Sequence, residues 1–154
     1  MGCAFLVPAP ERALLLECGV VDVRASTTAA ERLLAISKAL DELIRRHRPF
    51  VLAVERLYFN KNVQTAMRVS EARGVALLCA ARASLEIAEY TPQEVKISVT
   101  GNGRGDKKAV QRMLPLLVAI DAPITQDNVA DAVAIALTHA QRAHFAEAVE
   151  AASR

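Results

Sequence analysis

Glu55 is an acidic side chain at a position where the ligands of sheet proteins gather. It directly follows the apolar run from Phe50 to Val54, which Pro49 bounds on the other side. Such a run is typical of a strand buried on both faces. Because ligands bind outside the carboxyl ends of strands in sheets of this kind, Glu55 is a candidate site residue. The alternative is a polar residue that only ends the strand.

A second acidic group lies at residues 127–131, Asp-Asn-Val-Ala-Asp. In a helix, Asp127 and Asn128 each share a face with Asp131, because they lie four and three residues before it. Carboxylates on a buried helix and at a strand end are costly unless a cation neutralises them. Clustered oxygen ligands suit Mg²⁺, with Mn²⁺ as the alternative ion. A role for Asp127 as a helix cap stays open beside this interpretation.

The cations of the chain are concentrated in one segment. The formal net charge of the 154 residues is only +2, yet residues 96–112 carry a single carboxylate, Asp106, against five basic side chains: Lys96, Arg104, Lys107, Lys108 and Arg112. A local basic patch on a near-neutral protein fits a surface that faces a polyanion. A solvated loop and helix face is the alternative.

Composition narrows the class of protein. Hydrophobic residues make up 53% and charged residues 23% of the chain, which excludes disordered, collagen-like and coiled-coil proteins. No uninterrupted apolar stretch of about 18 residues is present to span a bilayer. The three cysteines have neither disulfide-framework nor zinc-site spacing. We therefore expect one globular domain in the cytoplasm, with no membrane association.

The order of the expected elements indicates an α/β or α+β architecture, because strands come first and then alternate with helices. Thr28 and Glu31 have the spacing of a capping box at the start of the first helix, which ends before Pro49. We expect strands at residues 2–7, 13–23, 50–54 and 85–90, and helices at residues 28–48, 62–83, 93–99, 106–118 and from about 127 onward.

Five segments carry a family resemblance: Val54 to Asn62, Glu71 to Ala76, Tyr90 to Lys96, Val99 to Lys107 and Ala130 to Ala140. In order and spacing they resemble the RuvC family of Holliday junction resolvases. The resemblance implies an α/β, ribonuclease H-like mixed sheet flanked by helices. It covers an incomplete nuclease domain at residues 1–140, followed by a helical tail at 141–154.

The resemblance also implies an activity and partners. Members of the family are homodimers that bind four-way junction DNA and make paired, Mg²⁺-dependent nicks in strands of like polarity during recombination and repair. The helix at residues 62–83 resembles the family's dimer helix. Cooperation with a RuvA–RuvB branch-migration complex is a further implication.

Roles for single residues follow from the same resemblance. Glu55 matches the family's second catalytic carboxylate and Asp131 its last, and both are expected as metal ligands. Asn128 stands at the third acidic position, where its amide oxygen is the expected ligand, and Lys107 is expected to take part in catalysis. Tyr58 replaces an aromatic residue that stacks on a base at the opened junction centre. The expected DNA-binding set is Tyr58, Asn62, Lys96, Arg104 and Lys107.

The sequence departs from the family in two places. The family's first strand, which lies in the middle of the sheet and carries the first catalytic Asp, is missing, so we expect unpaired strand edges or a closed-up sheet. A start codon farther upstream is the favoured explanation. Asn128 brings no charge and cannot act as a base. The alternative to an active resolvase is therefore a catalytically impaired, junction-binding pseudoenzyme.

Overall fold

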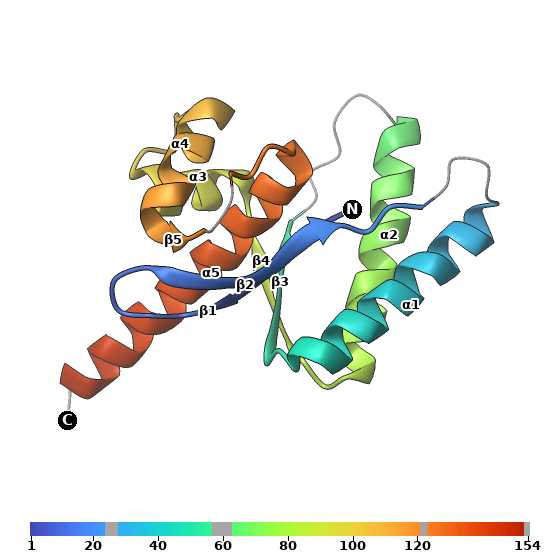
Figure 1. Ribbon diagram of the computed structural model, residues 1–154, viewed down its shortest axis with the longest axis horizontal. Helices are drawn as coiled ribbons and strands as arrows, with labels where there is room; N and C mark the ends of the chain where they lie inside the picture. Colours follow the sequence, from blue (N-terminus) through green and yellow to red (C-terminus); the bar gives the residue numbers. More distant parts are fainter. Residues whose placement is uncertain (24–27, 57–62, 121–122, 153–154) are drawn as a thin grey trace. The chain divides into compact units, whose positions relative to one another are not determined.

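The computed structural model describes residues 1–23, 28–56, 63–120 and 123–152 (Figure 1). The chain divides into two compact units. The first comprises Met1 and Val21–Glu89, and the second comprises Gly2–Val20 and Tyr90–Arg154. No helix among the described residues is long and apolar enough to cross a membrane. Tyr58 and Asn62 lie outside the described residues.

The first unit joins two helices to a two-stranded sheet. Its elements are α1 (Ala29–His47), β3 (Val51–Glu55), α2 (Val63–Arg82) and β4 (Glu86–Tyr90), and β3 pairs with β4. The core lies between the helices, where Ile36 and Leu40 of α1 are buried with Ala76 and Cys79 of α2. Two ion pairs, Arg32 with Glu71 and Arg82 with Asp41, also join α1 to α2.

Local signals set the ends of α1 as the sequence predicts. The hydroxyl of Thr28 accepts the N–H of Glu31 at 3.2 Å, and the Glu31 carboxylate accepts the N–H of Thr28 at 2.8 Å. This reciprocal pair satisfies N–H groups that have no partner inside the helix. Arg48, in the left-handed region with φ of 46°, ends the helix.

The second unit packs helices on a mixed three-stranded sheet. Its strands are β1 (Gly2–Val7), β2 (Ala13–Val20) and β5 (Val118–Ala119), in the order β1-β2-β5, with β1 antiparallel and β5 parallel to β2. Its helices are α3 (Pro92–Thr100), α4 (Lys107–Leu117) and α5 (Asp127–Ala152). Helix α5 packs along β1 and buries Val133 and Leu137, so it forms the core of this unit.

Small residues allow α5 to approach β1 closely. A Cβ atom added to Gly2 would lie 1.9 Å from the main-chain oxygen of Asn128, inside the first turn of α5. Ala130 and Ala134 are each 1% exposed farther along the helix. The start of α5 is therefore placed by a contact that only glycine at position 2 permits.

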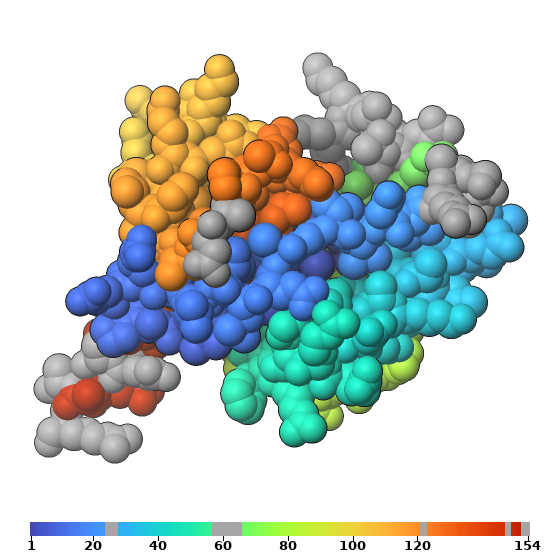
Figure 2. All heavy atoms as spheres, viewed as in Figure 1, coloured from blue at the N-terminus to red at the C-terminus, as the bar shows by residue number. Residues whose placement is uncertain are grey.

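The hairpin of β1 and β2 keeps apolar side chains at the surface. Val7, Leu14 and Leu16 are 43%, 49% and 48% exposed. In Figure 2 the two strands, in blue, lie open on the viewed face. Helix α5 therefore covers this hairpin only in part.

The α/β class and the element order are confirmed, with local corrections. Among the described strands, β1 and β3 belong to different sheets, consistent with the expected break in the sheet. The strand expected at 50–54 spans Val51–Glu55 and is half-buried rather than buried on both faces. The strand expected at 13–23 ends at Val20. The helix expected at 106–118 ends at Leu117, because Val118 pairs with Ala13 in β5, a strand that the sequence pattern missed.

Candidate functional site

Two carboxylates of the second unit converge on one ammonium group. Lys107 begins α4, which Asp106 caps by accepting the N–H of Ala109 at 2.7 Å. Asp127 and Asp131 lie on the first two turns of α5. The Nζ atom of Lys107 is 3.2 Å from Oδ2 of Asp127 and 3.2 Å from Oδ2 of Asp131. We call these three residues the lysine–carboxylate cluster.

Electrostatics within the lysine–carboxylate cluster favour a protonated lysine. Desolvation lowers the pKa of Lys107, but hydrogen bonds and charge attraction from Asp127 and Asp131 outweigh it, so the net shift of the pKa is upward. The side chains of Lys107, Asp127 and Asp131 are 49%, 65% and 53% exposed. Each pair is therefore screened by solvent and contributes at most about 1 kcal/mol. Because the ammonium of Lys107 is held this weakly, another cation can readily displace it from the two carboxylates.

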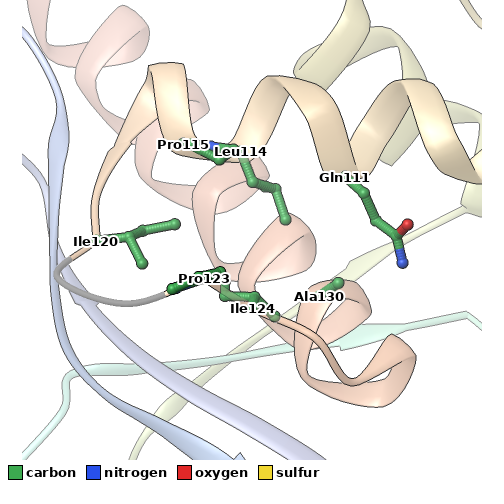
Figure 3. Close-up of a pocket in the computed structure, with 7 residues that line it drawn as sticks. All are labelled: Gln111, Leu114, Pro115, Ile120, Pro123, Ile124 and Ala130. Atoms are coloured by element: carbon green, nitrogen blue, oxygen red, sulfur yellow. The ribbon is translucent and has the colours of Figure 1, made fainter.

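Gln111 connects the lysine–carboxylate cluster to a cavity beside α4. Its side-chain amide donates to Oδ1 of Asp127 at 2.8 Å. Gln111 also lines a cavity of about 380 Å³, together with Leu114, Pro115, Ile120, Pro123, Ile124 and Ala130 (Figure 3). None of these described lining residues is titratable. The ionic chemistry therefore lies at the edge of the cavity, where Gln111 orients Asp127.

The lysine–carboxylate cluster fits part of a divalent-metal site. Mg²⁺ commonly binds one or two protein carboxylates and takes its other oxygens from water and substrate phosphate. Asp127 and Asp131 supply two carboxylates that already meet at one cationic group. Among the described residues, no group of three His, Cys, Asp or Glu side chains comes together to hold a metal ion. Asn128, the ligand expected from the family pattern, is exposed between the two.

Four other cations of the basic segment remain available to a ligand. Lys96 lies on α3, Arg104 lies in the loop before α4, and Lys108 and Arg112 lie on α4. Within the described part of the chain none of the four forms an ion pair, whereas Lys107 forms two. Apart from Lys107, the cations of the expected basic patch are therefore uncompensated among the described residues.

The glycines at 101–105 have a local structural role. Gly101 ends α3 with φ of 70°, a conformation that other residues rarely adopt. A Cβ atom at Gly105 would lie 2.9 Å from the hydroxyl of Thr100. The side chain of Asn102 accepts the N–H of Arg104 at 2.9 Å, which fixes the backbone that carries Arg104.

Glu55, the acidic residue of the first unit, ends β3 as expected and is exposed. Nε of Arg73, on α2, donates to the main-chain oxygen of Glu55 at 3.4 Å, and its guanidinium pairs with the carboxylate of Glu89 on β4. Nε of Arg56 lies 3.7 Å from the same carboxylate. The sequence pattern assigned no role to Arg73 or Glu89, because 16 residues separate them and only the fold brings them together.

The structure therefore groups the expected site residues in two sets. Lys107 and Asp131 meet in the second unit together with Asp127, which the sequence offered only as an alternative. Glu55 belongs to the first unit and has its own neighbours there. The expected DNA contacts Tyr58 and Asn62 lie outside the described residues.

Comparison with known proteins places this arrangement in a family. The model of the family "Crossover junction endodeoxyribonuclease RuvC" matches residues 2–139. The RuvC of Paenarthrobacter aurescens is 46% identical over 132 residues, which are 86% of this chain and 70% of that protein. The RuvC of Pelotomaculum thermopropionicum is also 46% identical over 132 residues, covering 86% and 80% of the two chains.

Solved structures agree with the sequence relatives. A Thermus thermophilus RuvC structure superposes with a TM-score of 0.85 at 30% identity, covering 94% of this chain and 89% of that one. The T. thermophilus RuvC in complex with Holliday junction substrate gives 0.84 at 30% identity, with coverage of 95% and 96%. The agreement in sequence and fold over most of the chain shows that this protein belongs to the RuvC family of crossover junction endodeoxyribonucleases.

Proposed function

We propose that this protein is a Holliday junction resolvase, a metal-dependent endonuclease that makes paired nicks in four-way DNA junctions during homologous recombination and DNA repair. The observation that carries the proposal is its likeness, at 30% identity and a TM-score of 0.84, to a RuvC bound to Holliday junction substrate. The comparisons lend no support to a pseudoenzyme.

In this proposal, carboxylates and a bound divalent ion serve the chemistry. Asp131 and Asp127 would hold a divalent ion, Mg²⁺ in the cell, and the amide of Asn128 would add a neutral oxygen. When bound, such an ion lowers the pKa of a water and stabilises the leaving oxygen of the phosphodiester. Glu55 is proposed as a metal ligand and catalytic carboxylate as well. Lys107 pairs with Asp127 and Asp131 and would contact a phosphate oxygen of the DNA.

The uncompensated cations supply the DNA-binding surface. Lys96 and Arg104 are proposed to contact backbone phosphates, because neither has an ion-pair partner in the described part of the chain. Such contacts position the junction and carry no sequence information. Tyr58 is proposed to stack on a base at the opened centre of the junction, and Asn62 is proposed to contact the DNA.

The proposed assembly is a homodimer formed through α2. On this helix Met67, Gly74, Leu78 and Ala81 are exposed and spaced by seven, four and three residues, so they share one face. Met67 and Leu78 are 59% and 57% exposed. The apolar face and its small residues fit close contact with a second copy. A dimer also places two sites on one junction, which paired nicking requires.

Two further proposals come from the family pattern. The dimer works with a RuvA–RuvB branch-migration complex in the cytoplasm. Residues 1–140 form the nuclease domain and residues 141–154 an extension, into which α5 continues as far as Ala152.

A two-stage assay tests the proposed function. The protein is mixed with a labelled four-way junction in EDTA, binding is measured by gel shift, and MgCl₂ is then added. A linear duplex with the sequence of one junction arm is the control substrate. We expect selective junction binding in EDTA and two symmetric nicks after addition of Mg²⁺.

Each other outcome has a definite meaning. Junction binding that is never followed by nicking contradicts the nuclease and favours a binding protein. Equal binding to junction and duplex contradicts structure selectivity. A loss of nicking when Leu78 is replaced by Asp, with a change from dimer to monomer in light scattering, supports the α2 interface.

A further inference from the structure

The carboxyl end of β3 is held by a side chain from α2. Arg73 donates from Nε to the main-chain oxygen of Glu55 at 3.4 Å and pairs through Nη2 with the Glu89 carboxylate. One guanidinium thus connects the helix, the last residue of β3 and the strand beside it. Its side chain is only 23% exposed, so solvent competes little for these bonds.

Both anchors of this contact are themselves fixed. On α2, Ala76 and Cys79 are 7% and 1% exposed in the core of the first unit, and Ala72 packs against that core. On the sheet, the N–H of Glu86 donates to the main-chain oxygen of Phe50 at 2.9 Å, which joins β4 to the chain just before β3. Arg73 therefore spans two rigid elements.

The carboxylate of Glu89 pairs with the two arginines near Glu55. It pairs with Arg73 and lies 3.7 Å from Nε of Arg56, the residue that directly follows Glu55. Without Glu89, both guanidiniums could turn toward the carboxylate of Glu55 and compete with a metal ion there. Glu89 thus orients Arg73 and also restrains Arg56.

We propose that Arg73, held by Glu89, is a positioning residue that fixes the backbone of Glu55 so that its carboxylate keeps one direction. The proposal rests on the proposed function, in which Glu55 is a metal ligand. A ligand of this kind must hold its geometry to within about 0.5 Å, and groups that hold a ligand strongly affect metal affinity and rate. Glu55 is the last residue of β3, and Arg73 bonds to its main-chain oxygen from outside the strand.

The arrangement requires the shape of arginine as well as its charge. A guanidinium presents several donors in a fixed plane, so Nε and Nη2 reach a carbonyl and a carboxylate at once. A lysine ammonium is a single point at the end of a flexible chain. Lysine at position 73 would preserve the charge but lose the simultaneous contacts.

The test measures metal binding and cleavage separately. Arg73→Gln, Arg73→Lys and Glu89→Gln are compared with the unmodified protein. Mn²⁺ binding is measured by electron paramagnetic resonance without DNA, and cleavage of a four-way junction is measured under single-turnover conditions across a range of Mg²⁺ concentrations. Junction affinity in EDTA and the thermal midpoint are recorded for every variant.

Arg82→Gln is the matched control. Arg82 lies on the same helix and pairs with Asp41 at 3.0 Å, away from Glu55. The change removes an arginine and its ion pair from α2 without touching β3. It reports what the loss of any ion pair on this helix does to stability.

We expect Arg73→Gln to weaken Mn²⁺ binding and to slow cleavage, each by about tenfold, with junction affinity within about twofold of the unmodified protein. Arg73→Lys is expected to recover less than half of the loss, and Glu89→Gln to cause a smaller loss of the same kind. Arg82→Gln should leave Mn²⁺ binding, Mg²⁺ dependence and rate unchanged.

Three results overturn the proposal: full recovery by Arg73→Lys, unchanged Mn²⁺ binding in Arg73→Gln, or losses in Arg82→Gln as large as those in Arg73→Gln. If the unmodified protein binds Mn²⁺ and nicks junctions while the variants match it, the positioning role fails and the nuclease stands. If the unmodified protein neither binds Mn²⁺ nor nicks, the proposed function fails and the positioning role fails with it.

Discussion

The carboxylates of the two units are accompanied by different cations. In the second unit, the ammonium of Lys107 contacts the side chains of Asp127 and Asp131, and all three side chains are about half exposed. In the first unit, the side chain of Arg73 is 23% exposed, and its guanidinium contacts the backbone of Glu55 and pairs with the carboxylate of Glu89. Lys107 therefore contacts the carboxylates themselves, whereas Arg73 contacts the backbone that carries Glu55.

The difference follows from the chemistry of the two side chains. Lysine is a hydrated point charge on a flexible stem, so an ion that competes for the same oxygens can displace it. Arginine offers a rigid fork that satisfies two acceptors at once. We infer that the cation of the lysine–carboxylate cluster is exchangeable, whereas the arginine beside Glu55 is fixed.

The largest expected effect on cleavage comes from removing a carboxylate of the lysine–carboxylate cluster. Asp131→Asn keeps the size of the side chain but deletes its charge, and we expect single-turnover cleavage to fall on the order of 10³-fold. Junction binding in EDTA should persist, because the uncompensated cations remain. Cleavage within tenfold of the unmodified protein would exclude Asp131 as a principal ligand, and Asp41→Asn on α1 is the control.

Opposite effects on metal affinity distinguish the two cations. Lys107→Met removes the ammonium group that competes with a metal ion for Asp127 and Asp131. The affinity for Mn²⁺ without DNA should therefore rise by about fivefold, which corresponds to the loss of about 1 kcal/mol of exposed ion pairing. Arg73→Gln should weaken the same binding. Cleavage should nevertheless slow in Lys107→Met, because a cation near the phosphate is lost. If Lys107→Met also weakens Mn²⁺ binding, the lysine is not a competitor and the comparison fails.

Local sequence signals predicted most of the fold. The apolar run before Glu55, the Thr28–Glu31 capping box and the apolar hairpin each report on neighbouring residues, so their elements form close to the expected bounds. The two-residue β5 carries no periodic signal, because its pairing with Ala13 depends on residues far apart in the chain. The division of the strands into two sheets depends on strand pairing in the same way.

The candidate site was predicted only in part for a similar reason. Asp131 and Lys107 lie in segments whose residue types predict a functional role. The structure places Nζ of Lys107 3.2 Å from Oδ2 of Asp131. The choice between Asp127 and Asn128 depends on the direction of each side chain in the first turn of α5, which spacing alone does not give. Arg73 and Glu89 are ordinary charged residues in sequence, and only the packing of α2 on the sheet makes them neighbours.

Two substitutions sharpen the roles of neighbouring residues in α5. Asn128→Asp adds a charge beside Asp127 and Asp131, so half-saturation with Mg²⁺ should occur at about fivefold lower concentration. Asp127→Asn should shift it by about the same factor in the opposite direction, because this carboxylate faces the same ammonium as Asp131. The measurement is the Mg²⁺ dependence of the cleavage rate. If the Mg²⁺ dependence is unchanged in Asp127→Asn, Asp127 is not a metal ligand and acts only as a carboxylate at the start of the helix.

The smallest expected effect tests a feature that both units share. In the capping boxes of α1 and α3, a main-chain hydrogen bond, from Thr28 and Thr91 respectively, is the largest cause that lowers the pKa of Glu31 and of Glu94 below 4.5. A lowered folded-state pKa gives stability that is present above the unfolded-state value and is lost as pH falls through the folded-state value. The free energy of unfolding in urea should therefore be lower for Glu94→Ala than for the unmodified protein at pH 7. This difference should disappear at low pH.

Thr91→Ala provides the contrast within the same capping box. Its hydroxyl does not titrate, and it accepts the N–H of Glu94 at 3.1 Å, so its loss should cost about 1 kcal/mol over most of the pH range. Because the same hydrogen bonds occur at Thr28 and Glu31, the corresponding variants of α1 should show the same two patterns. A pH-dependent loss in only one of the two capping boxes would show that the surroundings of the carboxylate, rather than the capping box, set its contribution to stability.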